Sequence, residues 1–520
     1  MNSPTEVLLI GYENKENLGL RSIMAYLLAN GHTAKILPFI PGEYDRIIEE
    51  CNAPGVKMIG FSLIFQYALN EFGALMKVLR KAGIRSHFTC GGHFPSLCPE
   101  ETMQALPELD SIVRFEGELT ALELLRNVDH PENWKGILGL AFRKDQEIVL
   151  NPNRALVPNL DVLPLIYRDE PEMGPMGVFR ADMLASRGCL FNCSFCSIRQ
   201  FYGSVKGRLR RIRSPKHVVD EMVSLYHDKE VRYFDFQDDD FAAHSKREKQ
   251  WIADFLREIE KAKLSDHIGW KISCRVDDLD PEIIKSMIAH GLRAVYLGVE
   301  SGSPSGLKSL NKNVTVEQNL YAINLIKSQN IALSMGFMLF EPYSTVQTVK
   351  ENLAFLDTVG KDGYFPISFC KMLPYVGTPI EEELRRSNRL KGSIIEPDYD
   401  FLDPLLNYYA FFTEQVFNER NSAKDRGLIY LQGLDFQYRL GKSFGKQYPD
   451  GYGAALKKLI ARYNKSMVNT LKALLNLVLK HGLEDIIDHQ EKIIEIAEHE
   501  WQCEYEVEIA CKKLELSGCV

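Results

Sequence analysis

Three cysteines lie close together in the segment SRGCLFNCSFCSIRQ, which occupies residues 186–200. Cys189, Cys193 and Cys196 have the spacing Cys-x3-Cys-x2-Cys, and no fourth cysteine follows nearby. A zinc site normally takes four ligands as two separated pairs, and no second pair of cysteines or histidines has a suitable spacing. A [4Fe–4S] cluster held by three thiolates keeps one iron open to another ligand. We therefore expect these cysteines to hold such a cluster, with inert packing cysteines as the alternative interpretation.

Composition and charge narrow the class of protein. The chain has 520 residues, 45% hydrophobic and 25% charged, with a net charge of −8, so a basic face for nucleic acid is not expected. The amino terminus has no basic leader ahead of an apolar run, and no stretch approaches the roughly 18–20 apolar residues of a membrane span. With 11 cysteines and no secretory signal, the thiols are expected to be reduced. We expect a cytoplasmic protein with neither a nucleic-acid nor a membrane partner.

Residues 1–150 alternate short apolar runs with amphipathic stretches, which is typical of a parallel, doubly wound α/β sheet. Ligands of such Rossmann-like sheets bind at the carboxyl ends of the strands. A helix is expected over 19–31, a hairpin over 138–151, and a linker over 151–179. The expected strands are 6–10, 33–37, 56–62, 84–90 and 110–115.

Residues 180–385 repeat this alternation and predict a partial (β/α)6 barrel, in which the cysteines directly follow the first strand. Residues 386–520 have apolar residues at helical spacing, which predicts a helical domain that caps the barrel and selects the substrate. Cys503, Cys511 and Cys519 recur every eight residues there, so we expect them to share a helix face rather than to hold a second cluster. The expected barrel strands are 181–186, 231–236, 270–275, 294–299, 331–337 and 366–372.

The cysteine segment resembles the signature of the radical S-adenosylmethionine enzymes, in which an aromatic residue precedes the last cysteine. Here that residue is Phe195, which the resemblance places against S-adenosylmethionine. FMLFEPYST (337–345) departs from the usual Gly-Phe-Pro-Gly motif, so the resemblance assigns no role to the loop after the fifth strand. The resemblance implies a [4Fe–4S] cluster that cleaves S-adenosylmethionine to a 5′-deoxyadenosyl radical. The other matching segments are FQDDDF (236–241), SCRVD (273–277), LGVESG (297–302) and YVGTP (375–379).

The resemblance also implies which side chains hold S-adenosylmethionine. Asp238 or Asp239 would accept hydrogen bonds from its ammonium group. Arg275 would bind its carboxylate through two contacts that lysine would not reproduce. Glu300 and Ser301 would meet the ribose hydroxyls. The alternatives are that the acids form a solvated turn and that Glu300 pairs with a neighbouring barrel cation and only stabilises the fold.

The amino-terminal region resembles the cobalamin-binding domain that precedes the barrel in one class of these enzymes. The matching segments are 17–37, 59–67, 90–101 and 115–125. Two adjacent glycines would let the backbone approach the bulky ligand, and the serine after the third strand would lie where its nucleotide tail passes. The residues that the resemblance places at cobalamin are Leu18, Gly19, Ser62, Phe65, Gln66, Gly91, Gly92, His93, Glu116 and Gly117.

One departure from other cobalamin proteins concerns the lower face of cobalt. The Asp-x-His-x-x-Gly sequence that supplies a histidine to cobalt in cobalamin mutases is absent, and His32 lacks this context. We therefore expect no histidine on cobalt, and we place Phe65 and Gln66 of the loop 62–67 there. A simple Gly-Gly turn and a structural His93 are the alternatives in this region.

Together these resemblances imply a cobalamin-dependent radical S-adenosylmethionine enzyme. We favour methyl transfer to an sp3 carbon, in which one S-adenosylmethionine methylates cobalt and a second supplies the radical. The alternatives are cyclisation, rearrangement or oxidation without methyl transfer, and a non-catalytic cobalamin sensor, against which the intact triad argues. The expected partners are a small-molecule or peptide substrate and an electron donor such as flavodoxin or ferredoxin. The sequence identifies no catalytic side chain beyond the cofactor ligands.

Overall fold

The computed structural model of the protein describes residues 4–13, 15–174, 177–241, 245–422 and 427–518. The chain divides into two compact units, each assembled from separate stretches of sequence. The segment that carries the three cysteines therefore belongs to the same unit as the amino-terminal sheet. The first unit comprises Met1–Pro171, Ala181–Glu221 and Pro374–Asp398, and the second comprises Glu172–Arg180, Met222–Leu373 and Tyr399–Val520.

A seven-stranded sheet forms the centre of the first unit, with the strands β1 (Val7–Gly11), β2 (Ala34–Pro38), β3 (Met58–Ser62), β4 (His87–Gly91), β5 (Ser111–Val113), β6 (Leu140–Lys144) and β7 (Glu147–Leu150). Their order is β2-β1-β3-β4-β5-β6-β7. The first five strands run parallel, and β6 and β7 extend the sheet as an antiparallel hairpin. All five residues of β1 are buried, as expected for a parallel strand with helices on both faces. This confirms the expected doubly wound α/β fold.

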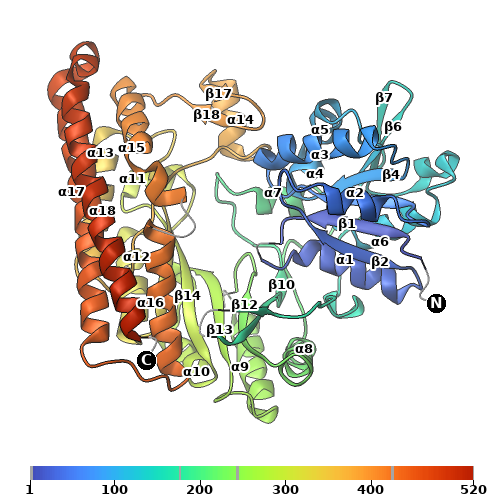
Figure 1. Ribbon diagram of the computed structural model, residues 1–520, viewed down its shortest axis with the longest axis horizontal. Coiled ribbons are helices and arrows are strands. Elements are labelled where there is room, and N and C mark those ends of the chain that lie inside the picture. The colour runs from blue at the N-terminus through green and yellow to red at the C-terminus, as the bar shows by residue number, and fades with distance from the viewer. Residues whose placement is uncertain (1–3, 14, 175–176, 242–244, 423–426, 519–520) are drawn as a thin grey trace. The chain divides into compact units, whose positions relative to one another are not determined.

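The helices of the sheet are α1 (Leu18–Ala29), α2 (Asp45–Cys51), α3 (Leu69–Lys81), α4 (His93–Leu97), α5 (Pro99–Ala105) and α6 (Glu118–Arg126). They build two core clusters, one with α1 and α6 and the other with α2, α3 and α5, on opposite faces of the sheet (Figure 1). Helix α1 begins after Asn17, whose side-chain oxygen accepts a hydrogen bond from the backbone N–H of Leu20 (3.2 Å). Such N-caps satisfy a backbone donor that the first helical turn leaves without a partner.

The cysteine segment adds a short hairpin and a helix to the first unit. β10 (Ser186–Arg187) pairs antiparallel with β11 (Arg211–Ile212), and α7 (Ser197–Gly203) lies between them in sequence. The strand expected over 181–186 is therefore wrong at its end, because the chain leaves the barrel sheet after β9 (Phe179–Met183). The physical reason is Arg213, which binds the two residues that follow β9. Its side chain donates a hydrogen bond to the carbonyl of Leu184, and its backbone N–H donates to the carbonyl of Ala185.

The second unit contains another seven-stranded sheet, with the strands β8 (Glu172–Met173), β9, β12 (Val231–Phe236), β13 (Gly269–Arg275), β14 (Leu292–Glu300), β15 (Ala332–Phe340) and β16 (Cys370–Lys371). Their order is β16-β15-β14-β13-β12-β9-β8, and β12 to β16 run parallel. The sheet curls into the half-barrel that the sequence predicts. Its helices are α8 (Pro215–Asp228), α9 (Lys246–Lys261), α10 (Pro281–Ala289), α11 (Pro304–Ser309), α12 (Val316–Ser328) and α13 (Val346–Gly360).

The strand expected over 366–372 is reduced to the two residues of β16. Pro366 has no N–H to donate to a sheet, and the N–H of Ile367 donates to the side chain of Asn464 (3.0 Å). Asn464 also donates to the carbonyls of Gly360 (3.1 Å) and Phe365 (3.0 Å). This buried amide thus replaces the ladder hydrogen bonds that a longer strand would make.

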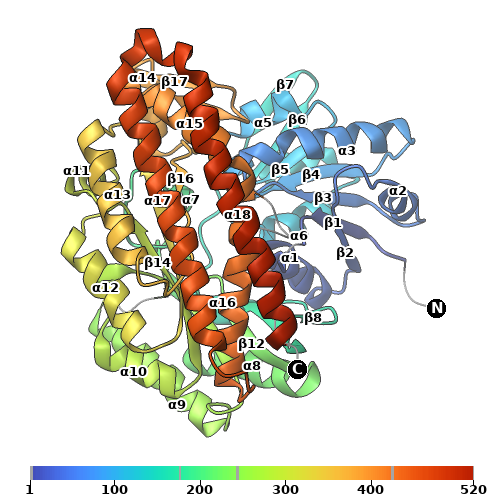
Figure 2. The same cartoon turned by 60° about the vertical axis from the view of Figure 1, so that its left-hand side comes forward.

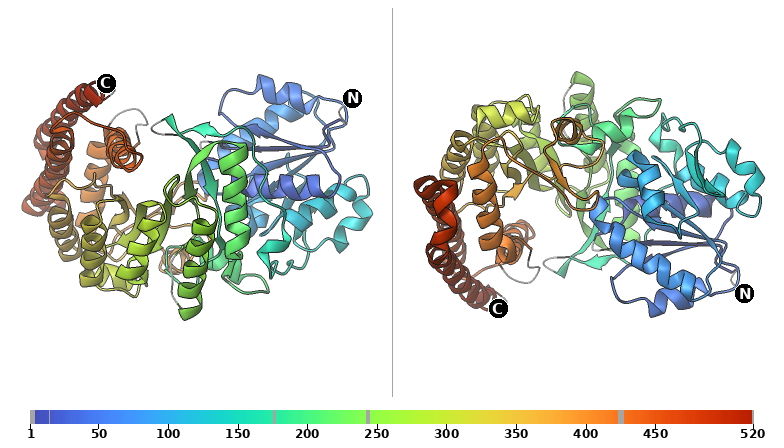
Figure 3. Two further views of the ribbon diagram at one scale, coloured as in Figure 1. Left: turned by 90° about the horizontal axis from the view of Figure 1, so that it is seen from below. Right: turned by 90° about the horizontal axis from the view of Figure 1, so that it is seen from above.

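The carboxyl-terminal region of the second unit is helical, with α15 (Pro404–Ser422), α16 (Gly427–Ser443), α17 (Tyr452–Asp485), η6 (Ile486–His489) and α18 (Gln490–Gly518). The long helices α17 and α18 lie side by side (Figure 2, Figure 3). Cys503 and Cys511 both lie in the core cluster that these helices share, which confirms one helix face for these two cysteines. Cys519 lies outside the described residues. Among the described helices, none is long and apolar enough to cross a membrane.

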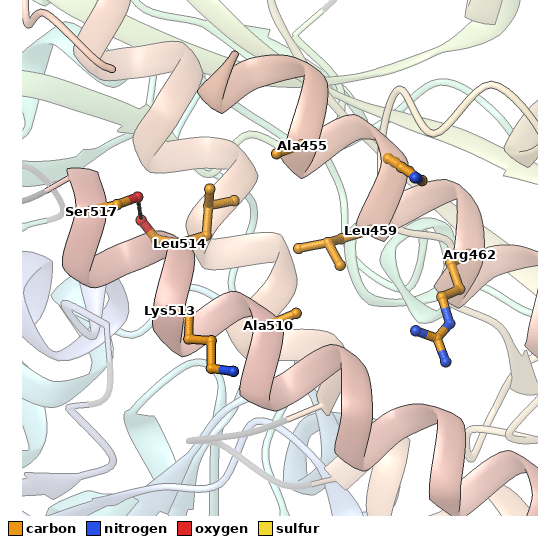
Figure 4. A pocket seen from close by; sticks show the side chains of 8 residues that line it. Ala455, Leu459, Arg462, Ala510, Lys513, Leu514 and Ser517 are labelled. Carbon is orange, nitrogen blue, oxygen red and sulfur yellow. Dashed lines mark hydrogen bonds between the residues drawn. The ribbon is translucent and has the colours of Figure 1, made fainter. Parts of the chain in front are cut away.

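Helices α17 and α18 leave a groove of about 490 Å³ between them near the carboxyl end of α18 (Figure 4). Ala455 and Ala510 face this groove, and side chains this small do not fill the space between the helices. Arg462 and Lys513 also line it, so its wall is partly cationic.

Replacing Asn464 with alanine should lower the free energy of unfolding of the second unit by about 3 kcal/mol, because buried backbone groups lose their partner. Lys472 on the same helix is the matched control: it pairs with Asp357 of α13 (2.8 Å), and both side chains are exposed. Lys472→Ala should cost about 0.5 kcal/mol. Urea unfolding followed by circular dichroism measures both. Equal losses for the two variants would contradict the role given to Asn464.

Candidate functional site

The three cysteines lie on the loop between β10 and α7. Cys193 is buried, and Cys189 and Cys196 are half-buried. The backbone N–H of Cys196 donates to the carbonyl of Cys193 (3.2 Å), which draws the last two cysteines into one turn. The carbonyl of Ser194 accepts a hydrogen bond from the N–H of Ile380 (3.1 Å), in the helix α14 (Pro379–Arg386). Three thiols on one short, anchored loop form a donor set that suits an iron–sulfur cluster with an open iron.

Gly188 fixes the conformation of the chain directly before Cys189. Its φ of 87° lies in the left-handed region, and a Cβ atom at this position would lie 1.8 Å from the carbonyl oxygen of Leu209. Only glycine can occupy such a position without displacing the backbone. Phe195, within the loop, is half-buried, and its contact with S-adenosylmethionine stays a prediction.

Arg187 joins the cysteine segment to the amino-terminal sheet. Its guanidinium contacts Glu116 (Nη1 to Oε1, 3.1 Å) and Glu118 (Nη2 to Oε1, 2.6 Å), which follow β5. The other oxygen of Glu116 pairs with Arg211 of β11 (2.8 Å), the strand that is paired with β10. Ser22 of α1 completes the network by donating to Glu118 (2.7 Å). Both strands of the hairpin that enters and leaves the cysteine loop are therefore tied to the loop after β5.

The charges of this network depend on one another because they are buried. Burial disfavours the charge of Arg187, but Glu118 and Glu116 outweigh it and raise its pKa. Burial likewise opposes the charge of Glu118, and Arg187 outweighs it and lowers the pKa of that carboxyl. A carboxyl whose pKa is lower in the folded state stabilises the fold at neutral pH, and this contribution is lost as the pH falls through the folded-state pKa. Sequence analysis assigned Glu116 to cobalamin and missed Arg187 and Glu118.

The residues predicted at cobalamin gather at the carboxyl edge of the first sheet. Ser62 ends β3, and its hydroxyl accepts a hydrogen bond from the side chain of Asn17 (3.1 Å). Gly91 ends β4, and a Cβ atom there would lie 3.0 Å from the carbonyl oxygen of Val113. Gly92 has a φ of 130°, and its Cβ atom would lie 2.1 Å from the carbonyl oxygen of Leu63. The two glycines therefore let neighbouring backbone segments pack closely at this edge, and their contact with cobalamin stays a prediction.

His93 packs against the helix that follows the cysteines. Its ring centroid lies 4.3 Å from that of Phe201 in α7, and the ring of Phe115 lies 5.3 Å from Phe201 on the side of β5. Burial lowers the pKa of His93 to about 4, so its imidazole is neutral at physiological pH. Helix α7 thus rests directly on the edge where cobalamin is expected.

The loop predicted below cobalt contacts the segment YVGTP at residues 375–379. The ring of Phe65, which is exposed, lies 5.7 Å from that of Tyr375. Gln66 is buried, and its side-chain oxygen accepts a hydrogen bond from the N–H of Val376 (3.2 Å). The amide nitrogen Nε2 of Gln66 is shielded from solvent and has no hydrogen-bond partner among the described residues. A buried donor of this kind fits a site whose ligand supplies the acceptor.

The remaining residues predicted at cobalamin lie near the carboxyl edge of the first sheet, and they differ in burial and in their contacts. Leu18 is buried at the start of α1, and Gly19 beside it has room for a side chain. Gly117 packs against Ile23, to which a Cβ atom would approach within 2.9 Å. Both carboxylate oxygens of Glu116 are occupied by arginines, so the structure places it in the network described above.

In the second unit, the acids predicted to bind the ammonium group follow β12. Asp238 is buried and Asp239 is exposed. The N–H of Phe241 donates to the carbonyl of Ser273 in β13 (2.9 Å), which anchors the end of this loop. Their flanking phenylalanines, Phe236 and Phe241, are packed together with a centroid distance of 4.9 Å. The acids therefore stand on an ordered loop at the carboxyl edge of the half-barrel rather than in a freely solvated turn.

Arg275 is the last residue of β13, and its guanidinium is held by Asp277 and Lys312. Its guanidinium contacts both carboxylate oxygens of Asp277 (2.9 and 3.1 Å) and donates to the carbonyl of Lys312 (2.6 Å). Its predicted contact with the carboxylate of S-adenosylmethionine stays a prediction, and Asp277 occupies two of its donors in this structure.

Glu300 ends β14 in a conformation that is unusual for a residue with a side chain. Its φ is 65°, and its carboxylate lies over Gly298 of the same strand and Gly336 of the neighbouring β15: Cβ atoms there would lie 2.9 and 3.2 Å from its two oxygens. Lys312 pairs with it (3.1 Å), which is the barrel cation of the alternative interpretation. Ser301 is buried and donates to Asn352 (2.9 Å). Strained conformations of this kind cluster at binding sites.

Two more side chains belong to this part of the half-barrel. Tyr296 is 38% exposed although it lies in the middle of β14, and its hydroxyl lies over Gly336. Cys370 of β16 is exposed, and its thiol donates to the carbonyl of Phe337 (3.6 Å). Burial, Glu300 and Cys370 together raise the pKa of Tyr296. Both groups are therefore protonated at neutral pH and can act as hydrogen-bond donors within the curl of the sheet.

Comparisons with known proteins agree with this arrangement. The family described as "B12 binding domain" matches residues 12–125, and "Radical SAM superfamily" matches residues 183–356. An uncharacterized methyltransferase of Pyrococcus horikoshii is 29% identical over 67% of this chain and 74% of its own length. The anaerobic magnesium-protoporphyrin IX monomethyl ester cyclase of Rubrivivax gelatinosus is 28% identical over 65% of this chain and 62% of its own length.

A solved structure extends the likeness to nearly the whole chain. The cobalamin-dependent S-adenosylmethionine radical enzyme OxsB, solved with aqua-cobalamin and S-adenosylmethionine bound, aligns with a TM-score of 0.68 at 18% identity. The alignment covers 99% of this chain and 80% of that one. Likeness at this identity concerns the fold, which both proteins share.

Replacing Gly188 with alanine should abolish binding of the iron–sulfur cluster although every cysteine is kept, because the new Cβ atom would displace the backbone before Cys189. Gly203, at the end of α7, is the matched control: its Cβ atom would meet only Leu209 at 3.7 Å. Iron and sulfide analysis after anaerobic reconstitution measures the outcome. Normal iron content in Gly188→Ala would show that the loop does not need this conformation.

Proposed function

We propose that this chain, which belongs to the cobalamin-dependent radical S-adenosylmethionine enzymes, transfers a methyl group to an unactivated sp3 carbon of its substrate. The radical domain implies a [4Fe–4S] cluster and S-adenosylmethionine, and the B12-binding domain implies cobalamin. These groups, when bound, supply the one-electron cleavage of S-adenosylmethionine and a methyl group carried by cobalt. The name of the Pyrococcus horikoshii relative supports methyl transfer.

The observation that carries this proposal is the attachment of the cysteine loop to the cobalamin edge. Arg187 ties the loop to the turn after β5, and Phe201 of the following helix packs on His93. A cluster loop and a cobalamin domain in one compact unit support coupled use of both cofactors. Methyl transfer by this route requires such coupling, and the name of the Pyrococcus horikoshii relative favours it over the other reactions that use the same cofactors.

The proposed function assigns the following roles to the residues of the chain. Cys189, Cys193 and Cys196 hold the cluster, with Phe195 beside it. Asp238 or Asp239 accepts hydrogen bonds from the ammonium of S-adenosylmethionine, Arg275 meets its carboxylate, and Glu300 and Ser301 meet the ribose. The carboxyl edge of the first sheet holds cobalamin, with Gln66 supplying its buried amide N–H and with no histidine on cobalt.

We assign the substrate to the curl of the half-barrel. Tyr296 and Cys370 offer hydrogen-bond donors there, and the helical region contacts the carboxyl end of β15. Phe340, the last residue of that strand, packs against Phe401 (5.9 Å) and Tyr409 (5.3 Å), and Tyr399 donates to its carbonyl (3.5 Å). Elements from the helical region thus stand beside the strand ends, which supports their role in selecting a small-molecule or peptide substrate. The reaction also requires an electron donor, such as flavodoxin or ferredoxin, and reduced thiols suit a cytoplasmic enzyme.

The second candidate is cyclisation, rearrangement or oxidation on the same cofactors without methyl transfer. The relative from Rubrivivax gelatinosus, which is named as a cyclase, favours it. The two reactions differ in the fate of S-adenosylmethionine, because methyl transfer consumes one molecule as methyl donor and another as radical source.

Incubating the reconstituted holoenzyme with methyl-labelled S-adenosylmethionine and a reductant should give both S-adenosylhomocysteine and 5′-deoxyadenosine, with label on cobalamin. Cys193→Ala should lose the 5′-deoxyadenosine, because the cluster is lost. The measurement is liquid chromatography with mass spectrometry. Formation of 5′-deoxyadenosine without any S-adenosylhomocysteine would favour the second candidate, and the absence of both products would favour a cobalamin-binding sensor.

Glu300→Gln should weaken binding of S-adenosylmethionine about 10-fold or more while iron content stays unchanged, because a hydrogen bond to a charged group is lost. Glu351→Gln is the control: Glu351 accepts a hydrogen bond from Ser303 (2.5 Å), three residues after Glu300, without facing the strand ends. Isothermal titration of the reconstituted enzyme and thermal melting are measured together. Unchanged affinity with a large drop in melting temperature would mean that Glu300 serves only its pair with Lys312.

A further inference from the structure

Two histidines and an aspartate converge at the turn between α17 and α18, in the second unit and away from every residue assigned above. The turn begins at Gly482, whose φ of 66° and ψ of −167° interrupt α17. His481 precedes this break, Asp485 ends α17, and His489 ends η6. One ligand atom from each side chain lies within 4.8 Å of the other two. The end of α17, on both sides of the break at Gly482, and the end of η6 therefore present metal-binding groups to a common point.

The geometry is closer to that of a metal site than to that of a hydrogen-bonded cluster. Oδ2 of Asp485 lies 3.8 Å from Nδ1 of His481 and 4.0 Å from Nε2 of His489, beyond hydrogen-bond distance in both cases. Ligands of a tetrahedral zinc ion with bonds of about 2.1 Å stand about 3.4 Å apart, so the two histidine–aspartate separations are about 0.5 Å longer than in a bound site. The two imidazole centroids are 3.7 Å apart.

A second observation points to a ligand at this place. The side chain of His481 is only 10% exposed, and its Nε2 is shielded from solvent without a hydrogen-bond partner among the described residues. The other ring nitrogen, Nδ1, faces Asp485 and is the one that an ion in this turn would take. Asp485 is 66% exposed, which leaves a path for the ion and a position for water.

We propose that His481, Asp485 and His489 bind one divalent first-row transition ion of the zinc type, with water completing its coordination. Two imidazoles and one carboxylate suit zinc, nickel or copper, whereas magnesium and calcium prefer oxygen ligands alone. The ion has a structural role: it closes the turn that joins the two long helices. Asn464 of α17 accepts a hydrogen bond from Ile367 of the half-barrel. Glu500 of α18 has a buried carboxylate, which accepts hydrogen bonds from Ser466 (2.5 Å) and Thr470 (2.9 Å) of α17.

The test uses the full-length holoenzyme without a histidine tag, with its cluster reconstituted so that the three thiolates of the radical domain are occupied. Zinc is added, unbound metal is removed by desalting, and zinc, iron and cobalt are counted by mass spectrometry. We expect about one zinc per chain, with unchanged iron and cobalt, and a melting temperature several degrees higher than that of the zinc-free protein. His481→Gln and His489→Gln should each reduce the retained zinc at least 10-fold and remove the thermal shift.

His499→Gln is the matched control, because His499 is an exposed histidine on α18 outside the turn, and it should retain the zinc. Asp485→Asn, at an exposed position that tolerates substitution, should also weaken binding and provides a variant whose folding is not in question. X-ray absorption at the zinc edge should show nitrogen and oxygen ligands. Retention of zinc in both His481→Gln and His489→Gln, sulfur ligands at the zinc edge, or no retained zinc in the unmodified protein would each overturn the proposal.

Discussion

The buried contact of Arg187 with Glu116 and Glu118 is the interaction on which the candidate site most depends. It joins the last residue of β10 to the turn that follows β5, and Gly188 and Cys189 come next in the chain. Through this contact the loop that carries the three cysteines takes its position from the amino-terminal sheet. A buried ion pair adds little net stability, but removing one partner leaves an uncompensated charge and is strongly destabilising. The network therefore fixes a geometry rather than serving mainly as a source of stability.

Four further features constrain the position of the cysteine loop and its surroundings. Gly188 holds a backbone conformation that a side chain would not permit, and Phe201 sets α7 against His93. On the other side of the loop, Ile380 donates to the carbonyl of Ser194, and nearby Val376 donates to Gln66 of the loop predicted below cobalt. Chemistry that couples two cofactors needs fixed distances, because misplacement of reacting groups by about 1 Å can cost about 100-fold in rate. The contacts around the cysteines supply that constraint within one compact unit.

The sequence predicts correctly those elements that depend on residues close together in the chain. The doubly wound sheet, five parallel barrel strands and the cysteine loop all follow from apolar periodicity and residue spacing. It does not predict elements whose hydrogen bonds come from residues far away in the sequence. The strand expected over 366–372 is shortened because Asn464, about 100 residues later, takes the N–H of Ile367. The arginine partners of Glu116, Arg187 and Arg211, also lie far from it in sequence, and its contact with cobalamin stays a prediction. The residues that hold each cofactor stay predictions, because their roles require ligands that spacing alone does not position.

The central claim is that Arg187 sets the position of the cluster relative to cobalamin. The most direct test is the distance between the reduced cluster and cob(II)alamin, measured by pulsed electron paramagnetic resonance in the unmodified enzyme and in Arg187→Met. The account predicts one narrow distance distribution in the unmodified enzyme. In the variant it predicts a shifted or clearly broader distribution at equal iron and cobalt content. An identical, narrow distribution in both proteins would contradict it.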